Sequence, residues 1–332
     1  MSLRLINAHE VNRLLPMSAC IALMRKAMTL PGPGGAVQPI RTGLKLPGSP
    51  NLLGMMPGYV PNENDAGSAQ LGIKVVTVFP GNFGTDLGSH QGMVLMFDPK
   101  SGRPVGVVEA REITAIRTAA ASAVATEALS RPDATVLAVF GYGEQATVHI
   151  EALLQVRAFE RVLVWGRDAA RVHSFCESSR QRFGVAVEAV ATVEDAVERA
   201  DVLCTVTAAP EPFLMGRWLR AGQHLNVVGS SIPTTAEVDH EAVRRSRFYV
   251  DFLDSALALA GEFRRARDAG VVTEAHILGS IGDVLTGRVP GRRDAGDITL
   301  FKSLGMVCED LVATRFVLDE AERLGVGRVV EF

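Results

Sequence analysis

The chain has 332 residues, of which 47% are hydrophobic and 21% are charged, and its formal net charge is −3. This is the composition of a globular protein, and it excludes a disordered, collagen-like or coiled-coil chain. The length allows two domains with substantial cores. The charge gives no basic surface for nucleic acid or for an anionic membrane, so we expect neither partner.

The cysteines and the N-terminal region indicate the compartment. Cys20, Cys176, Cys204 and Cys308 are far apart in the sequence, so we expect buried free thiols and no metal site. Two early charges, Arg25 and Lys26, interrupt the first apolar stretch, and no run approaches the roughly 20 apolar residues of a membrane span. The sequence therefore predicts a soluble, cytoplasmic protein.

The first third of the chain predicts a mixed α/β unit. A short strand at 3–6 precedes Asn7, which forms a capping-box pattern with Glu10 at the start of a helix. A second helix is expected over 17–30. Apolar stretches separated by turn-rich segments then indicate a mainly antiparallel sheet. These stretches are 52–56, 72–79, 93–97 and 105–108.

The remainder predicts a different architecture. An Ala-rich stretch favours a helix over 114–129. Apolar runs that alternate with helical segments then indicate βαβ units and a parallel sheet covered on both faces. These runs are 135–140, 162–165, 185–190, 202–206, 225–228 and 248–250. A last helix, over 301–324, is expected to return to the first unit.

The fold class is therefore α/β, with a doubly wound parallel sheet of the Rossmann type and a second domain of α+β structure. We expect the Rossmann domain over 119–304. The α+β domain is expected to be discontinuous, with residues 1–118 joined by a C-terminal segment over 305–332.

A dinucleotide fingerprint stands at the start of the βαβ series. The segment Gly141-Tyr142-Gly143-Glu144-Gln145-Ala146 matches G-x-G-x-x-A, follows an apolar strand and opens a helix. Gly141 permits the tight turn, Gly143 lets the backbone approach a pyrophosphate, and Ala146 lets the helix pack closely on the strand. The N–H groups at the helix N-terminus then face the phosphates.

The end of the second strand of this series indicates which dinucleotide is preferred. A carboxylate at this strand tip would bind the ribose hydroxyls of NAD, but here the tip carries Gly166 and Arg167, with Asp168 one position later. A guanidinium can bind a phosphate through two hydrogen bonds. The sequence therefore favours NADP(H), with NAD(H) also possible. The alternative is that Arg167 is a solvated turn residue.

Two cations stand in otherwise apolar elements. Lys74 lies in the apolar strand at 72–79, and Arg117 is the only charge between Ile113 and Thr126. A buried cation without a partner is costly, so each should meet an anion. That anion is either a substrate carboxylate or an internal acid such as Glu109 or Glu112.

Several segments, taken together, resemble the ornithine cyclodeaminase/mu-crystallin family. They are LGIKVV (71–76), SHQG (89–92), ITAIRTAA (113–120), the fingerprint at Gly141, VVGS (227–230) and FKSLG (301–305). Their order and spacing match the family over nearly the whole chain. The resemblance implies a homodimer with a Rossmann domain and a separate domain for substrate binding and dimerisation.

The same resemblance implies roles for individual residues. Arg41, Lys74 and Arg117 correspond to the family's substrate-carboxylate site, with Lys74 as the catalytic proton donor. Ser89 and His90 lie in a segment that contributes to the substrate pocket. His90 could relay a proton there, but the favoured interpretation is a structural histidine. Ser231 stands in the substrate segment where the cyclodeaminases carry an aspartate. No metal is implied.

Cofactor contacts are implied beyond the fingerprint, Gly166 and Arg167. They are Arg117, Thr118, Thr205, Thr207, Val228, Gly229 and Lys302. Thr207 follows a strand end, where ligands of open α/β sheets bind, but an ordinary strand-end threonine is the alternative. For Lys302 the alternative is a purely structural contact.

The serine at position 231 decides between activities. Its hydroxyl does not ionise near neutral pH, so it cannot replace the aspartate as a base. We therefore predict an NAD(P)H-dependent reductase of a small 2-imino acid, such as Δ1-pyrroline-2-carboxylate or Δ1-piperideine-2-carboxylate. A hydride moves from nicotinamide C4 to the C=N carbon. The alternatives are reductive amination as in alanine dehydrogenases, ornithine cyclodeamination, and NADP-dependent small-molecule binding as in mu-crystallin.

Overall fold

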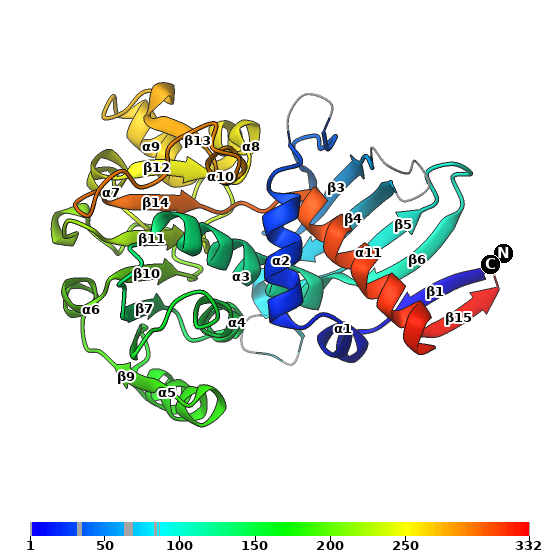
Figure 1. The fold of residues 1–332 in the computed structure, drawn as a ribbon, viewed down its shortest axis with the longest axis horizontal. Coiled ribbons are helices and arrows are strands. Elements are labelled where there is room, and N and C mark those ends of the chain that lie inside the picture. Colours follow the sequence, from blue (N-terminus) through cyan, green and yellow to red (C-terminus); the bar gives the residue numbers. More distant parts are fainter. Residues whose placement is uncertain (1, 32–34, 63–68, 83–84, 86, 332) are drawn as a thin grey trace. The chain divides into compact units, whose positions relative to one another are not determined.

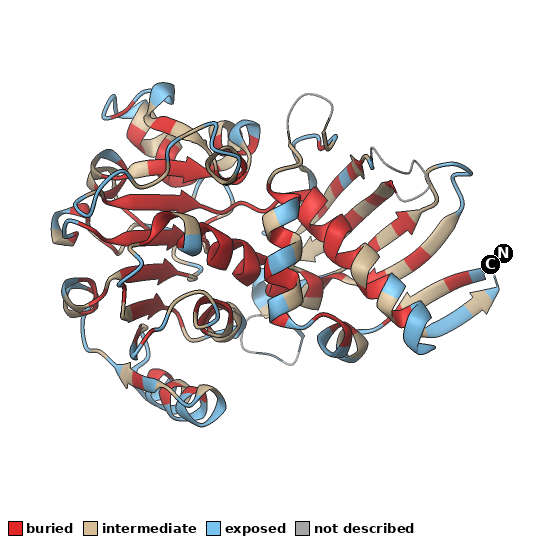
Figure 2. Ribbon diagram, viewed as in Figure 1, coloured by how far each residue is buried: buried red, intermediate tan, exposed pale blue. Residues whose placement is uncertain are grey.

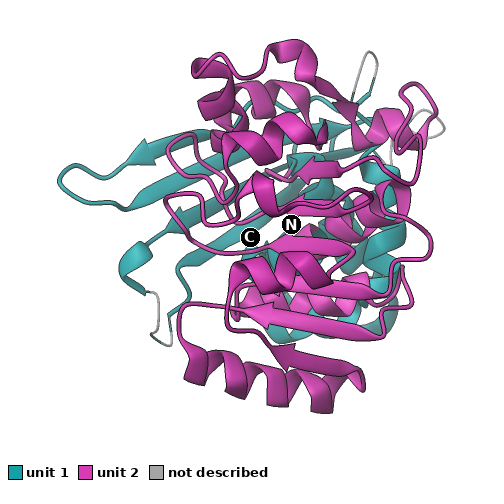
Figure 3. Cartoon of the chain, turned by 90° about the vertical axis from the view of Figure 1, so that its left-hand side faces the viewer, with its two compact units in different colours: residues 1–117, 306–332 teal, residues 118–305 magenta. Residues whose placement is uncertain are grey.

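The computed structural model describes residues 2–31, 35–62, 69–82, 85 and 87–331. The chain divides into two compact units, which are coloured separately in Figure 3. Unit 1 comprises residues 1–117 and 306–332, and unit 2 comprises 118–305. All residues of unit 2 are described.

In its described residues, unit 1 contains a seven-stranded sheet of order β15-β1-β6-β5-β4-β3-β2, which is antiparallel except for the β1–β6 pair. This confirms the predicted mainly antiparallel sheet. Its elements are β1 (Ser2–Ile6), α1 (Ala8–Leu14), α2 (Met17–Ala27), β2 (Thr42–Lys45), β3 (Leu52–Val60), β4 (Gln70–Val78), β5 (His90–Phe97), β6 (Pro104–Glu109), α11 (Val307–Leu324) and β15 (Arg328–Glu331).

One face of this sheet is buried and the other is partly exposed. Strand residues alternate between the two faces, and the buried residues of β3 to β6 fall on alternate positions such as Met56, Lys74, Val94 and Val108. Helix α11 contacts β3, β4 and β5, and also packs on α2. Figure 1 shows α11 running across these strands. Helix α11 therefore covers the buried face, and α2 packs against this helix.

Unit 2 is built around an eight-stranded sheet of order β13-β12-β14-β11-β10-β7-β8-β9, in which every pair is parallel. Helix α3 (Ala110–Leu129) precedes it. The remaining elements are β7 (Val136–Phe140), α4 (Glu144–Leu153), β8 (Arg161–Trp165), α5 (Ala169–Phe183), β9 (Ala186–Ala189), α6 (Val193–Arg199), β10 (Val202–Thr205), β11 (His224–Val227), α7 (His240–Arg245), β12 (Arg247–Val250), α8 (Leu253–Leu259), α9 (Gly261–Asp268), β13 (Ile277–Ser280), α10 (Ile281–Leu285) and β14 (Thr299–Lys302).

The central strands of unit 2 are buried along nearly their whole length (Figure 2). Strands that are apolar on both sides need cover on both faces, which is the arrangement of a doubly wound sheet. The order β9-β8-β7-β10-β11 reverses direction between β7 and β10, as in a Rossmann fold. The predicted fold class is confirmed.

Two predicted helix starts are wrong. Helix α3 begins at Ala110 rather than 114, because the carboxylate of Glu109 accepts the N–H groups of Arg111 and Glu112 at 2.8 and 2.9 Å and caps the helix early. The helix predicted over 301–324 begins only at Val307. Residues 299–302 form β14 instead, and Gly305 in the positive-φ region separates strand from helix.

Candidate functional site

Lys74 lies on the covered face of the unit 1 sheet. It pairs in register with Met56 on β3 and with Val94 on β5, both of which are buried. Only 3% of Lys74 is exposed. An ammonium in such apolar surroundings needs a partner.

Three glycines bring the partner within reach, because they let α11 lie unusually close to the sheet. A Cβ at Gly58, Gly72 or Gly106 would lie 2.5, 2.6 or 2.7 Å from the side chains of Val307, Leu311 and Leu318, respectively. A larger residue at any of these positions would force the facing side chain of α11, or the helix itself, to shift. The close approach places the carboxylate of Asp310, one residue before Leu311, beside Lys74.

A buried ion cluster results. The Nζ atom of Lys74 donates to Oδ1 of Asp310 at 3.0 Å, and Nε of Arg117 donates to the same oxygen at 3.0 Å. Nη1 of Arg117 donates to Oε2 of Glu309 at 2.9 Å. Both acids are fully buried. Two of the three cations predicted for the carboxylate site therefore meet at one oxygen.

The acids of this cluster were missed by the sequence reasoning. That reasoning named Glu109 and Glu112 as internal partners, but Glu109 caps α3, and Oε2 of Glu112 accepts from Asn12 at 2.8 Å. The actual partners come from about 190 to 240 residues further along the chain. One signal was available: Glu309 and Asp310 interrupt the apolar side of the last predicted helix.

Burial and charge tune the cluster. The pKa of Lys74 is lowered to about 8. Burial is the largest cause, and the positive charges of Arg117 and Arg41 act in the same direction, while the negative charge of Asp310 partly offsets them. Although burial opposes this, the charges of Arg117 and Lys74 hold the pKa of Asp310 below its usual range. Lys74 is thus close to its titration point near neutral pH, while Asp310 stays ionised.

The ammonium of Lys74 also has N–H donors that no acceptor in the described residues uses. An ammonium carries three N–H donors, and among the described residues only Asp310 accepts from this one. The second oxygen of Asp310, Oδ2, is buried and has no hydrogen-bond partner within the described ranges. Both groups can therefore bond a ligand or a water molecule.

The other predicted substrate residues lie along the same sheet. Arg41 comes one residue before Thr42, which pairs with Met55 on β3. Because the next residue of β3, Met56, pairs with Lys74, Arg41 lies two strand spacings, or roughly 10 Å, from Lys74. His90 pairs with Val78, four residues beyond Lys74, or roughly 13 Å along the strand. Its Nδ1 is 3.0 Å from Oγ of Ser89. His90 and Ser89 are thus not in the ion cluster.

The predicted cofactor residues of unit 2 gather at one edge of its sheet. Phe140, Trp165, Thr205, Val227 and Lys302 are register partners across five strands. They mark the carboxyl ends of these strands, where open α/β sheets bind ligands next to the point at which the strand order reverses. The fingerprint, Gly166, Thr207, Val228 and Gly229 immediately follow these ends.

The fingerprint has the geometry that a dinucleotide requires. Gly141 has φ +130°, and a Cβ there would lie 3.0 Å from the carbonyl oxygen of Val206. A Cβ at Gly143 would meet nothing within 4 Å, so space is open above this turn. No side chain caps the N-terminus of α4, which leaves N–H groups for a pyrophosphate. The residues present fit a nicotinamide dinucleotide.

A buried acid that the sequence reasoning missed fixes the ends of β10 and β11. Oε1 of Glu237 accepts both N–H and Oγ1–H of Thr207, each at 2.7 Å, and Oε2 accepts from Oγ1 of Thr205 and from N of Gly229 at 2.7 Å. Burial raises the pKa of Glu237, against the effect of Lys302 and these donors. Glu237 therefore holds three of the predicted cofactor residues in place.

Lys302 and Ser231 have different surroundings from each other. Lys302 is fully buried, donates to the carbonyl oxygen of Ser230 at 2.5 Å and pairs with Glu262 at 3.1 Å. This environment matches the structural alternative for Lys302. Ser231 is half-buried in the turn after β11. Val228 is buried beside it, and Thr118 is buried within α3.

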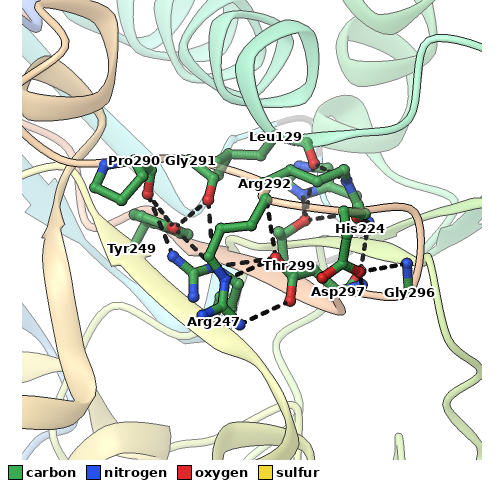
Figure 4. Close-up of polar contacts among 12 residues, drawn as sticks. Leu129, His224, Arg247, Tyr249, Pro290, Gly291, Arg292, Gly296, Asp297 and Thr299 are labelled. Atoms are coloured by element: carbon green, nitrogen blue, oxygen red, sulfur yellow. Dashed lines mark hydrogen bonds and ion pairs between the residues drawn. The ribbon is translucent and has the colours of Figure 1, made fainter.

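The opposite edge of the sheet holds a polar cluster with a structural role (Figure 4). There Nδ1 of His224 is 2.9 Å from Oγ1 of Thr299, and Arg292 donates to the carbonyl oxygen of Leu129 at 2.7 Å. Burial lowers the pKa of His224 to about 3, so the ring is neutral. Because this is the amino end of the strands, we assign the cluster to sheet stability rather than to ligand binding.

Comparison with known proteins decides the family. The sequence profile of the ornithine cyclodeaminase/mu-crystallin family matches residues 3–324. The chain belongs to the ornithine cyclodeaminase/mu-crystallin family. The predicted resemblance is thereby confirmed.

Proteins that are similar to this chain include reductases and a dehydrogenase. The ketimine reductase mu-crystallin of Mus musculus is 37% identical over 305 residues, which cover 92% of this chain and 90% of the mouse protein. The Δ1-pyrroline-2-carboxylate reductase of Thermococcus litoralis, solved with NADH and L-proline, has a TM-score of 0.93 at 32% identity and covers 98% and 99% of the two chains. An archaeal alanine dehydrogenase dimer with bound NAD has a TM-score of 0.92 at 28% identity, over the full length of both chains.

In the described ranges, no three His, Cys, Asp or Glu residues are grouped so that they could hold a metal ion. None of the helices there combines the length and apolar character that crossing a membrane requires.

Proposed function

We propose that this chain is an NAD(P)H-dependent reductase of a small 2-imino acid, with a cyclic ketimine such as Δ1-pyrroline-2-carboxylate or Δ1-piperideine-2-carboxylate as substrate. The observation that carries the proposal is the state of Lys74. It is a nearly buried ammonium with a pKa of about 8 and N–H groups to spare, anchored by Asp310. The ketimine and Δ1-pyrroline-2-carboxylate reductases among its relatives support the same reaction.

In this proposal the three cations divide the work of binding. Arg117 has a planar guanidinium that can bind a carboxylate, and its position is fixed by Glu309 and Asp310. Arg41 adds positive charge near Lys74. Together they hold the substrate carboxylate, and Lys74 directs its remaining N–H groups toward the imine.

The chemistry needs one hydride and one proton. When bound, a reduced nicotinamide would supply the hydride for the C=N carbon, and the π electron pair of that bond would pass to the nitrogen. Lys74 donates the proton that this nitrogen takes up, which gives the amino acid. Solvent then reprotonates the neutral side-chain amine of Lys74. The pKa of about 8 suits this role, because general acids work best when their pKa lies near the operating pH.

For the cofactor we propose NADP(H) as the preferred form, with NAD(H) also accepted. Arg167 supports this preference, because it lies exposed at the tip of β8 without an ion-pair partner in unit 2. The carboxylate of Asp168 is used instead to cap α5, where it accepts from N of Arg171 at 3.1 Å.

We further propose a cytoplasmic homodimer. The sheet face of unit 1 that the helices leave uncovered is largely apolar, with Met55, Ile73, Val75, Met93 and Leu95 on adjacent strands. A second copy of the chain fits this face, since stable homodimer interfaces are apolar. The four cysteines are buried, and such buried thiols suit a reducing compartment.

The decisive experiment follows the oxidation of NADPH and of NADH spectrophotometrically. The substrates are the five- and six-membered cyclic 2-imino acids and, in parallel, pyruvate with ammonia. We expect turnover of a cyclic imino acid without added ammonia. Turnover only with pyruvate and ammonia would instead identify a reductive aminase, and release of ammonia from ornithine without net change in nicotinamide absorbance would identify a cyclodeaminase.

A further inference from the structure

A second arginine follows the tip of β8 in the chain, in the helix that begins there. Arg171 lies in the first turn of α5, and its guanidinium carbon is 5.0 Å from the centroid of the Tyr142 ring. This is the distance of a cation–π contact. Tyr142 is the second residue of the fingerprint turn, so the contact joins the fingerprint to the strand tip where an adenine-side ribose would bind.

The position of the Tyr142 ring depends on Gly166. A Cβ at Gly166 would lie 2.2 Å from Cδ1 of Tyr142. The ring therefore rests directly on the backbone of the β8 tip, in space that only a glycine leaves open. Because Arg171 lies over this ring, its guanidinium is held beside the tip as well.

Arg167 and Arg171 form no ion pair within unit 2, all of which is described. Other arginines on the same elements do: Arg161 pairs with Glu188, and Arg182 pairs with Glu151. Asp168 lies between the two arginines in sequence, but it caps the helix through the backbone N–H of Arg171. The tip thus presents two guanidinium groups to solvent.

We propose that Arg171 is a second specificity-determining residue, which binds the 2′-phosphate of NADP(H) together with Arg167. This inference rests on the proposed function and extends it. A guanidinium suits a phosphate because it donates two parallel, charge-assisted hydrogen bonds. Contact with Tyr142 restricts Arg171 before the ligand arrives, so less side-chain entropy is lost on binding.

The test compares two ligands that differ only in the phosphate in question. Adenosine 2′,5′-bisphosphate and 5′-AMP are titrated into the purified protein by calorimetry. The variants are Arg167→Ala, Arg171→Ala and Arg171→Lys, which keeps the charge but loses the planar fork. Arg171→Ala leaves the cap of α5 intact, because Asp168 accepts from the backbone. Arg217→Ala is the matched control, since Arg217 lies 5.0 Å over Trp218 elsewhere in unit 2.

We expect Arg171→Ala to weaken binding of the bisphosphate about tenfold or more, as for the loss of a charge-assisted pair, and to leave 5′-AMP unchanged. Arg171→Lys should fall between wild type and Arg171→Ala, and the Arg217 variant should match wild type. An Arg171 variant that binds the bisphosphate normally, or that binds both ligands more weakly to the same degree, overturns the inference. If Arg167→Ala still weakens binding of the bisphosphate alone, the cofactor preference stands in that case. Equal affinity of wild type for both ligands would overturn the preference and the inference together.

Discussion

Oδ1 of Asp310 lies 3.0 Å from Nζ of Lys74 and accepts a hydrogen bond from it in a fully buried position. The same oxygen accepts from Nε of Arg117 at 3.0 Å. One carboxylate therefore positions two cations and also raises the pKa of one of them against the effect of burial. The predictions that follow test this cluster first.

Lys74→Met should abolish turnover while the dinucleotide still binds. Loss of a general acid typically costs about 10²–10⁴-fold in rate, and methionine keeps most of the volume in a buried site. Turnover is measured by NADPH oxidation, and dinucleotide binding by calorimetry. A variant with near-normal activity would show that the proton comes from elsewhere.

The reduction should lose activity as pH rises through about 8. The proton donor is the charged form of Lys74, which burial and neighbouring cations destabilise. Above its pKa the neutral form dominates, so kcat/KM for the imino acid should fall about tenfold per pH unit when one proton is required. Oxidation of the amino acid needs the neutral amine and should rise over the same range. The fall in the reductive rate and the rise in the oxidative rate are both measured from pH–rate profiles.

Two substitutions should move the descending limb of the kcat/KM profile, the pH range over which reduction is lost, in opposite directions. Asp310→Asn removes the negative charge that raises the pKa of Lys74, so the descending limb should move to lower pH. Arg41→Ala removes a positive charge that lowers it, so the limb should move to higher pH. Identical profiles for both variants would mean that another group controls the observed titration.

Removing Asp310 should also destabilise the fold. Loss of one member of a buried ion pair leaves an uncompensated charge and typically costs about 3–5 kcal/mol. We therefore expect Asp310→Ala to lower the free energy of unfolding by about this amount, measured by urea denaturation. Asp319→Ala is the control, because that acid forms an exposed pair with Arg315 on the same helix. A similar loss in both variants would contradict a special role for the buried cluster.

Glu237→Gln should impair cofactor binding and leave the imino-acid site intact. An amide offers one acceptor oxygen where the carboxylate accepts from four donors, so the ends of β10 and β11 lose part of their support. We expect KM for NADPH to rise about tenfold or more, as for the loss of a hydrogen bond to a charged group. Glu211→Gln, at an exposed acid paired with Arg265, should behave as wild type. An unchanged KM for NADPH in Glu237→Gln would refute this positioning role.

The proposed dimer is tested at the uncovered sheet face. Met93 is 45% exposed there, and Met93→Asp would place a charge in an apolar interface, where it is costly. We expect this variant to be monomeric by size-exclusion chromatography with light scattering. Leu253→Asp serves as the control, because Leu253 is 46% exposed but lies in unit 2. Dissociation of both variants, or of neither, would argue against this face.

The sequence by itself determined the local structure and the family. The apolar run at 202–206 was predicted as a strand covered on both faces, and residues 202–205 form the buried strand β10. The capping pattern of Asn7 and Glu10 is likewise realised as predicted. The fingerprint at Gly141 was predictable because its function depends on neighbouring residues in one turn. These features rest on interactions over a few residues, which the sequence states directly.

Only the tertiary structure decided which residues that are far apart in the sequence interact with each other. Pairing of Lys74 with Asp310 requires α11 to cross the sheet over Gly58, Gly72 and Gly106, and nothing in the sequence near Lys74 reports that path. The role of Glu237 likewise depends on how β10 and β11 lie side by side. Packing brings together residues that are far apart in the chain, so a single sequence shows that a buried charge needs a partner without showing which residue it is.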